Sequence, residues 1–200
     1  MNKTVIFDLG NVLVRWDPQE ILRRFSDDAQ KREAFRLVLS GQCWKVLDAG
    51  LIDYENALKF YAGELQQPVS EVERLMQTMR ESLEPLPLGE NLLRDLHRRG
   101  ADLICISNMP LHANRYLRQR YDYWPLFRGI VISAEVQLTK PNPEIFRYAL
   151  DKYHLNPAQT LFVDDMQVNI DAAAALGIAG VCYQNRPQDV EQVYRFIEAA

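Results

Sequence analysis

Short apolar segments alternate with amphipathic segments over most of the chain. Residues 4–7, 103–106 and 160–163 are apolar and rich in β-branched or aromatic side chains, which is typical of strands buried on both faces. Residues 129–133 and 180–183 have the same character. Apolar positions at helical spacing follow over residues 89–99, 112–120, 143–153, 169–176 and 190–199. This alternation predicts an α/β fold with a doubly wound parallel sheet.

The stretch from residue 16 to residue 84 has a different pattern, because no convincing strand interrupts its helical spacing. Helices are expected over residues 20–25, 32–39, 54–64 and 70–79, with Ser70 and Glu73 as a capping box. We therefore expect a small all-helical cap at residues 16–84, inserted after the first strand. The catalytic core would comprise residues 1–15 and 85–200.

Polar residues that can carry chemistry stand at the ends of the predicted strands. Asp8 follows the first strand, and Ser107 ends the second. Asp164 and Asp165 follow another strand, and Lys140 lies in a loop after a third. Ligands of such sheets bind beyond the carboxyl ends of the strands, so one crevice is expected to collect these residues.

Asp8 is the candidate nucleophile. A carboxylate can attack phosphorus to form an aspartyl-phosphate, which divides one difficult reaction into two easier steps. A single aspartate after a strand more often caps a turn. The assignment of Asp8 therefore depends on the other residues expected beside it.

Asp164 and Asp165 form a pair of adjacent carboxylates. Such a pair is unfavourable unless a cation or hydrogen bonds offset the repulsion, and an isolated pair would be a solvated acidic turn. Hard oxygen ligands suit Mg²⁺, which needs few protein carboxylates. With Asp8 nearby, the pair predicts a magnesium site, and Asn169 could orient a water or a carboxylate there.

Ser107 and Asn108 could hold the non-bridging oxygens of a phosphate through side-chain and main-chain groups, although such residues also cap helices. Lys140 precedes Pro-Asn-Pro, whose two prolines stiffen the loop. A fixed ammonium there could offset charge on Asp8 and on the phosphate, whereas a lysine considered alone would be an ordinary surface residue.

Composition narrows the setting. The net charge of −4 comes from interspersed charges and leaves no basic stripe for nucleic acid or membrane. Cys43, Cys105 and Cys182 are far apart and form no CxxC pair, which argues against a disulfide framework and favours a reducing compartment. No apolar run resembles a signal peptide or membrane span. We expect a cytoplasmic monomer or weak homodimer whose partner is a small phosphorylated molecule.

In their order, four segments resemble the haloacid dehalogenase (HAD) superfamily of hydrolases. They are VIFDLGN at residues 5–11, LICISN at 103–108, KPNP at 140–143 and LFVDD at 161–165. The resemblance covers essentially the whole chain. It points to the phosphatase subgroup that includes a bacterial α-D-glucose-1-phosphate phosphatase and the N-terminal phosphatase domain of soluble epoxide hydrolase.

The resemblance implies a Rossmann-like core with a mobile cap, and Mg²⁺-dependent hydrolysis of a phosphate monoester through an aspartyl-phosphate on Asp8. It implies that Ser107 and Asn108 bind the transferring phosphoryl group and that Lys140 steadies it.

The resemblance also implies a ligand set for the metal. Asp165 would ligate Mg²⁺ directly, and the metal would take a carboxylate oxygen of Asp8 and the main-chain carbonyl of Gly10. Asp164 and Asn169 would support the metal through water or hydrogen bonds.

One position departs from the family pattern. Most phosphatases of the superfamily carry a second aspartate two residues after the nucleophile, where it protonates the leaving group, and here that residue is Gly10. The acid role, worth about 10²–10⁴ in rate, has no obvious owner, although Asp17 is one substitute. A sugar phosphate such as glucose 1-phosphate has an acidic leaving hydroxyl and would depend less on this acid.

Two other functions stay open. A metal-independent 2-haloacid dehalogenase would also use Asp8 and would not need an aspartate at Gly10, but the adjacent carboxylates would repel its anionic substrate. A catalytically silent binding module is the other alternative. Whichever holds, the cap should choose the ligand, and its features to inspect are Trp16, Trp44, Tyr54 and the segment Asp48-Ala49-Gly50.

Overall fold

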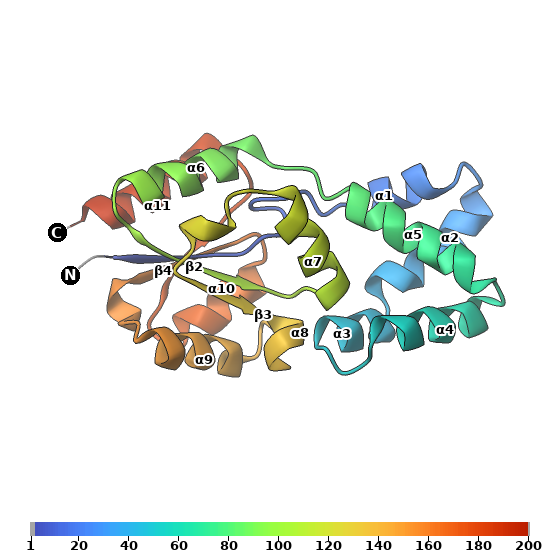
Figure 1. Ribbon diagram of the computed structural model, residues 1–200. Helices are drawn as coiled ribbons and strands as arrows, with labels where there is room; N and C mark the ends of the chain where they lie inside the picture. Colours follow the sequence, from blue (N-terminus) through green and yellow to red (C-terminus); the bar gives the residue numbers. More distant parts are fainter. Residues whose placement is uncertain (1–2, 200) are drawn as a thin grey trace.

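The structure, a computed structural model that describes residues 3–199, has one parallel five-stranded sheet at its centre (Figure 1). The strands are β1 (Thr4–Phe7), β2 (Asp102–Ser107), β3 (Gly129–Ile132), β4 (Thr160–Asp164) and β5 (Ala179–Cys182). Their order in the sheet is β3-β2-β1-β4-β5. The predicted doubly wound α/β architecture is therefore confirmed.

The middle of the sheet fixes where the strand ends emerge. β1 lies between β2 and β4, with Phe7 level with Cys105 and with Val163. All four residues of β1 are buried, as a central strand of a covered parallel sheet requires. Asp8 follows β1 directly, so it lies between the ends of β2 and β4, at Ser107 and Asp164.

Helices cover both faces of the sheet. On one face lie α6 (Pro87–Arg98), α7 (Leu111–Arg120) and α11 (Pro187–Glu198), and on the other lie α9 (Pro143–Tyr153) and α10 (Gln167–Ala174) (Figure 1). Side chains of β1 alternate between the two faces: Val5 and Phe7 join one apolar cluster and Ile6 joins the other. None of the helices in the described range is long and apolar enough to cross a membrane.

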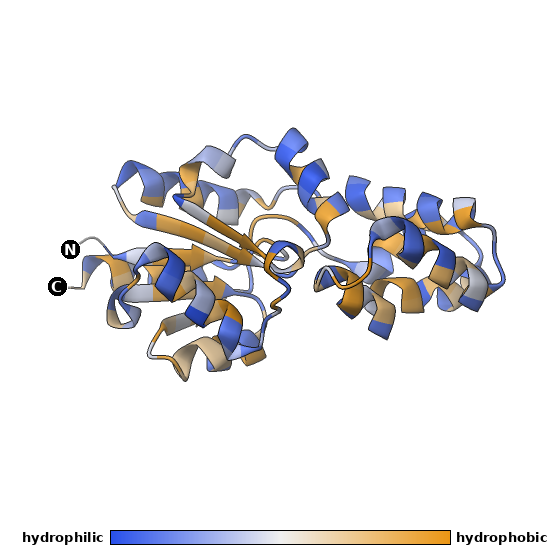
Figure 2. Cartoon of the chain, turned by 60° about the horizontal axis from the view of Figure 1, so that its bottom comes forward, coloured by the Kyte–Doolittle hydropathy of each residue, from blue (hydrophilic) through white to orange (hydrophobic). Residues whose placement is uncertain are grey.

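Five further helices form a cluster at one end of the molecule, which we call the cap (Figures 1 and 2). They are α1 (Pro18–Phe25), α2 (Ala29–Ser40), α3 (Gln42–Asp48), α4 (Tyr54–Leu65) and α5 (Val69–Glu81). The two chain segments that enter and leave the cap run side by side, since Arg15 N–H donates to Glu84 O and Leu86 N–H to Leu13 O, both at 2.8 Å. The domain boundaries proposed from the sequence, residues 16 and 84, fall at this paired linker and remain a proposal.

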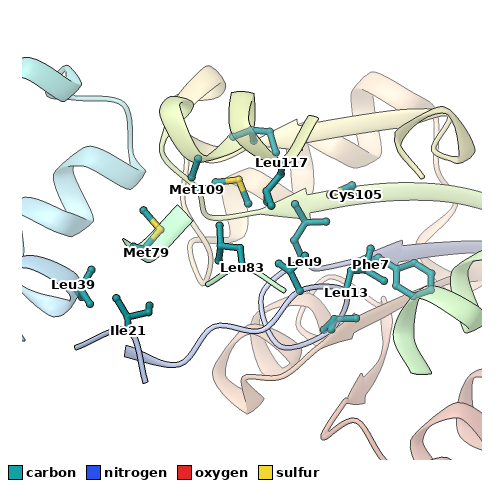
Figure 3. Packing of buried hydrophobic residues seen from close by; sticks show 14 of the residues in the cluster. Phe7, Leu9, Leu13, Ile21, Leu39, Met79, Leu83, Cys105, Met109 and Leu117 are labelled. Carbon is teal, nitrogen blue, oxygen red and sulfur yellow. The ribbon is translucent and has the colours of Figure 1, made fainter. Parts of the chain in front are cut away.

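An apolar cluster joins the cap to the core (Figure 3). It runs from Leu9 and Met109 at the sheet's edge through Leu83 of the linker to Met79 of α5. These side chains are at most 7% exposed. The cap is therefore packed onto the loops that follow β1 and β2.

Three local predictions need correction. Ser70 does not cap α5, because that helix begins at Val69 after Pro68 and has no side-chain cap. The short helix α3 was not expected, because its seven residues give too little periodicity to recognise. Ser133, expected at the end of a strand, is the first residue of a short helix, α8 (Ser133–Val136). Two 3₁₀ turns, Trp124–Leu126 and Pro157–Gln159, complete the described elements.

Candidate active site

Lys140 joins two of the carboxylates predicted from the sequence. Its Nζ lies 2.8 Å from Asp8 Oδ1 and 2.7 Å from Asp164 Oδ2. All three side chains are buried, the lysine at 2% exposure and Asp164 at 0%. The loop before α9 thus brings an ammonium to the carboxyl ends of β1 and β4, as the strand pattern predicted.

Asn108 fixes the main chain around that lysine. Its Nδ2 donates to Lys140 O at 2.9 Å, and its Oδ1 accepts from Lys140 N–H at 2.8 Å. The side-chain amide was expected to hold a phosphate, but in the structure it holds Lys140. Ser107, its neighbour, is buried and lines the cavity described below.

The two adjacent aspartates have different surroundings. Both oxygens of Asp164 accept from Asn169 Nδ2, at 2.9 and 3.1 Å, and Oδ1 also accepts from Met166 N–H at 2.8 Å. Asp165 is half-buried, lines the cavity and accepts from Asn11 Nδ2 at 3.0 Å. Asp164 is therefore held by Asn169, Met166 and Lys140, whereas Asn11 is the one described side chain that donates to Asp165.

Three carboxylates at this edge could hold a metal ion. Asp8, Asp164 and Asp165 each offer an oxygen, and these oxygens lie within 4.8 Å of one another. One lysine faces three carboxylates, so the cluster has an excess of negative charge. A divalent cation with hard oxygen ligands would remove that excess, which is the donor set Mg²⁺ prefers. Gly10 lines the same cavity, and a main-chain carbonyl needs no side chain to serve as a metal ligand.

Burial, and to a smaller degree the neighbouring negative charges, shifts the pKa values of the two aspartates that line the cavity. Burial raises the pKa of Asp8 to about 7, against the opposing charge of Lys140, and Asp164 adds to the rise. Burial also raises the pKa of Asp165, although Asn11 opposes it. Burial lowers the pKa of Lys140, but the carboxylates of Asp8 and Asp164 outweigh it and hold that pKa above its ordinary value. The lysine therefore stays charged.

A cavity of about 230 Å³ lies above these residues, between the core and the cap. Its polar part is the cluster just described together with Asp48 of the cap. The rest of its lining is apolar: Val14, Trp16, Trp44, Met79, Leu83, Met109, Pro110, Ala113 and Met166. The cavity thus has a charged floor and an apolar wall.

Several residues have places that sequence patterns did not indicate. Asp17, a possible substitute acid, caps α1 by accepting from Glu20 N–H and lines a neighbouring groove of about 760 Å³ instead. Tyr54 packs against His112 in a tilted arrangement, with ring centroids 4.2 Å apart, and is not among the residues that line the cavity. Asn11 was quoted in the first motif without a role. In the structure its side chain donates to Asp165 and accepts from Trp16 N–H, and its positive φ of 53° marks a tight turn that the sequence pattern did not indicate.

The fold and the site define a class of α/β enzymes in which a buried aspartate beyond a central parallel strand works beneath an inserted cap. The family model of the haloacid dehalogenase-like hydrolases matches residues 2–177. The chain therefore belongs to the haloacid dehalogenase-like hydrolase family.

Known proteins resemble the chain over most of its length. It is 28% identical to sesquiterpene phosphatase astK of Aspergillus oryzae, over 90% of this chain and 88% of that protein. It is 24% identical to drimenol cyclase drtB of Aspergillus calidoustus, of which it spans only 36%. A HAD family enzyme of Bacteroides thetaiotaomicron, solved as a magnesium complex, superposes with a TM-score of 0.80 at 21% identity, over 97% of this chain and 98% of that one.

Proposed function

We propose that this protein is a Mg²⁺-dependent phosphatase that hydrolyses a small phosphate monoester through an aspartyl-phosphate on Asp8. The observation that carries the proposal is the buried Asp8, held by Lys140 at 2.8 Å on the floor of a cavity beside two more carboxylates. Two likenesses support it: one relative is a sesquiterpene phosphatase, and a structural neighbour was solved with magnesium.

The residues present suit phosphoryl transfer in two steps. A carboxylate oxygen of Asp8 attacks phosphorus while the P–O bond to the leaving alcohol breaks. Lys140, fixed by Asn108, offsets the charge on Asp8 and on the phosphoryl oxygens. The hydroxyl of Ser107 would bind one of those oxygens. Water then attacks the aspartyl-phosphate, the P–O bond to Asp8 breaks, and phosphate leaves.

The metal would be held by Asp8, Asp165 and the Gly10 carbonyl, with Asp164 and Asn169 in support. Bound there, Mg²⁺ would neutralise charge on the phosphoryl oxygens. The hydrogen bonds that hold Asp164 favour this division between the direct ligand Asp165 and its supporting neighbour.

The cavity wall favours an alcohol that is mostly apolar. A sugar would bring several hydroxyls against tryptophan, methionine and leucine side chains, and each hydroxyl left without a partner costs about 1–3 kcal/mol. We therefore propose the monophosphate of a largely hydrocarbon alcohol as the substrate class, consistent with the sesquiterpene named for one relative. Glucose 1-phosphate remains the alternative, because its acidic leaving hydroxyl suits Gly10.

Phosphate release from a panel of monoesters tests both proposals. We expect turnover that needs Mg²⁺ and stops in chelator, with kcat/KM at least about 10-fold higher for a prenyl or alkyl phosphate than for glucose 1-phosphate. Asp8→Asn should lower turnover by on the order of 10⁴-fold or more. The variant should keep its fold in metal-free buffer, because it removes one of the carboxylates that crowd Lys140. Normal hydrolysis by Asp8→Asn would overturn the proposal.

The two alternative functions give different results. A 2-haloacid dehalogenase would release halide from a 2-haloacid in the presence of chelator, which the crowded carboxylates oppose. A silent binding module would show no turnover of any monoester. A BeF₃⁻ adduct on Asp8 that forms only with Mg²⁺ would argue against the silent module.

A further inference from the structure

One carboxyl group reaches the cavity from the cap. Asp48 is the last residue of α3 and lines the cavity. Its Oδ1 is buried and has no hydrogen-bond partner among the described residues. A buried polar atom without a partner is costly, so it calls for a functional explanation. Among the described residues that line the cavity, Asp48 is the one that brings a carboxyl group from the cap, where the other lining side chains are apolar.

The main chain of Asp48 is tied to the core. Ser133 Oγ donates to Asp48 O at 2.5 Å and accepts from Met109 N–H at 2.9 Å. Ser133 is completely buried at the start of α8, and Met109 directly follows the Ser107-Asn108 segment. Asp48 is therefore two hydrogen bonds away from the loop proposed to hold the phosphate.

The turn that follows Asp48 lies in close contact with the core. Gly50 has a φ of +67°, and a Cβ there would lie 2.3 Å from Ala134 O of α8. Only glycine adopts this conformation and this approach without strain. The turn that carries Asp48 thus lies directly against the core.

The surroundings of Asp48 favour its protonated form. Burial raises its pKa to about 7, although a hydrogen bond with the Trp44 side chain opposes the rise. No lysine or arginine of the described chain forms an ion pair with it. Tyr61 of α4 lies near Asp48 and is neutral at pH 7, and burial raises its pKa further. Tyr61 also contacts Cys43 of α3, a thiol whose pKa is raised by burial.

Given the proposed phosphatase activity, we propose that Asp48 is the catalytic acid that the family places at the position of Gly10. As Asp8 attacks and the ester P–O bond breaks, the Asp48 carboxyl gives its proton to the leaving oxygen, which departs as a neutral alcohol. The Asp48 carboxylate then takes a proton from the water that attacks the aspartyl-phosphate, which restores both aspartates. The cap would thereby supply a proton that the core lacks.

Leaving groups of different acidity test this role. Asp48→Asn should lower kcat/KM for an alkyl phosphate, whose alkoxide needs a proton, by about 10²–10⁴-fold. The loss for p-nitrophenyl phosphate, whose phenolate leaves unaided, should be less than about 10-fold. The parameter kcat/KM reports only the steps up to the first irreversible one, so a defect in water attack does not enter it. Asp48→Glu should recover part of the alkyl phosphate activity.

The controls separate this inference from the proposed function. Asp27→Asn removes an exposed carboxylate from the cap and should leave both substrates unchanged. Equal losses on both substrates in Asp48→Asn, or a change confined to KM, would show a binding or structural residue and overturn the inference alone. If wild-type enzyme shows no Asp8-dependent turnover of p-nitrophenyl phosphate with Mg²⁺, the proposed function itself fails, and this inference with it.

Discussion

The two sides of the cavity are built in opposite ways. On the core side, Lys140, Asp8, Asp164 and Asn169 bind one another at 2.7–3.1 Å. The cap side contributes the apolar side chains of Trp44 and Met79 and the carboxyl of Asp48, whose Oδ1 has no hydrogen-bond partner among the described residues. Such a network of charged side chains, each held by its neighbours, suits phosphoryl transfer, because every phosphate monoester presents the same phosphate group. Apolar side chains and one carboxyl group suit contact with the alcohol part of the substrate, which differs from one monoester to another.

Among the substitutions considered, loss of Lys140 should have the largest effect on stability and turnover. Lys140→Met leaves Asp8 and Asp164 buried without their cation, so we expect destabilisation by about 3–5 kcal/mol in metal-free buffer and loss of turnover. Urea unfolding in chelator measures the first quantity. Lys152→Met, on an exposed face of α9, should stay within about 0.5 kcal/mol of wild type. If Lys140→Met leaves the free energy of unfolding unchanged, the ion pairs of Lys140 with Asp8 and Asp164 contribute little to stability.

Mg²⁺ should stabilise the protein through the carboxylates of the core side. Mg²⁺ at 100 times its dissociation constant should raise the free energy of unfolding by about 2.7 kcal/mol. Asp165→Asn should lose that gain, whereas Asp171→Asn on α10 should keep it. Thermal unfolding with and without Mg²⁺ gives the comparison, and an equal metal response in both variants would remove Asp165 from the site.

The docking of the cap can be weakened at one position. Gly50→Ala meets the carbonyl of Ala134 and a positive φ, so it should cost about 1–3 kcal/mol and lower kcat/KM for alkyl phosphates. Gly63→Ala is a matched control inside helix α4, where a Cβ meets no atom within 4 Å, and it should stabilise by about 0.5–1 kcal/mol. If Gly50→Ala retains full activity and stability, the contact with α8 does not position the cap.

The core side could be predicted from the sequence for a physical reason. The carboxyl ends of parallel strands lie at one end of the sheet, so Asp8 and Asp164 were expected there once the strands were recognised. The structure adds that their strands, β1 and β4, are neighbours. Lys140 was expected in the same crevice because its loop follows a strand of the same sheet, and its Nζ lies 2.8 Å from Asp8 Oδ1. The role of Asn108 was harder to foresee, because either a phosphate or a main-chain group satisfies an amide equally well.

The cap side could not be predicted in the same way. The position of Asp48 depends on a seven-residue helix that gives too little periodicity and on a hydrogen bond from Ser133, which lies far away in sequence. Ser133 itself had the pattern of a strand residue. A glycine at position 50 is compatible with many turns, and only the approach of Ala134 shows why it is needed. Contacts between elements that are far apart in the sequence leave little trace in the local pattern of residues around either element.

The smallest expected effect concerns Met166. It tests whether an apolar side chain of the core also takes part in substrate selection. Met166 belongs to the core, and its N–H holds Asp164, yet its exposed side chain lines the apolar part of the cavity. Met166→Gln keeps the main-chain hydrogen bond, so stability should change by less than about 0.5 kcal/mol. The preference for a prenyl phosphate over glucose 1-phosphate should fall by about 2- to 10-fold, because an amide replaces hydrocarbon at the wall. Steady-state kinetics on both substrates measure the ratio. An unchanged ratio would show that Met166 takes no part in substrate selection.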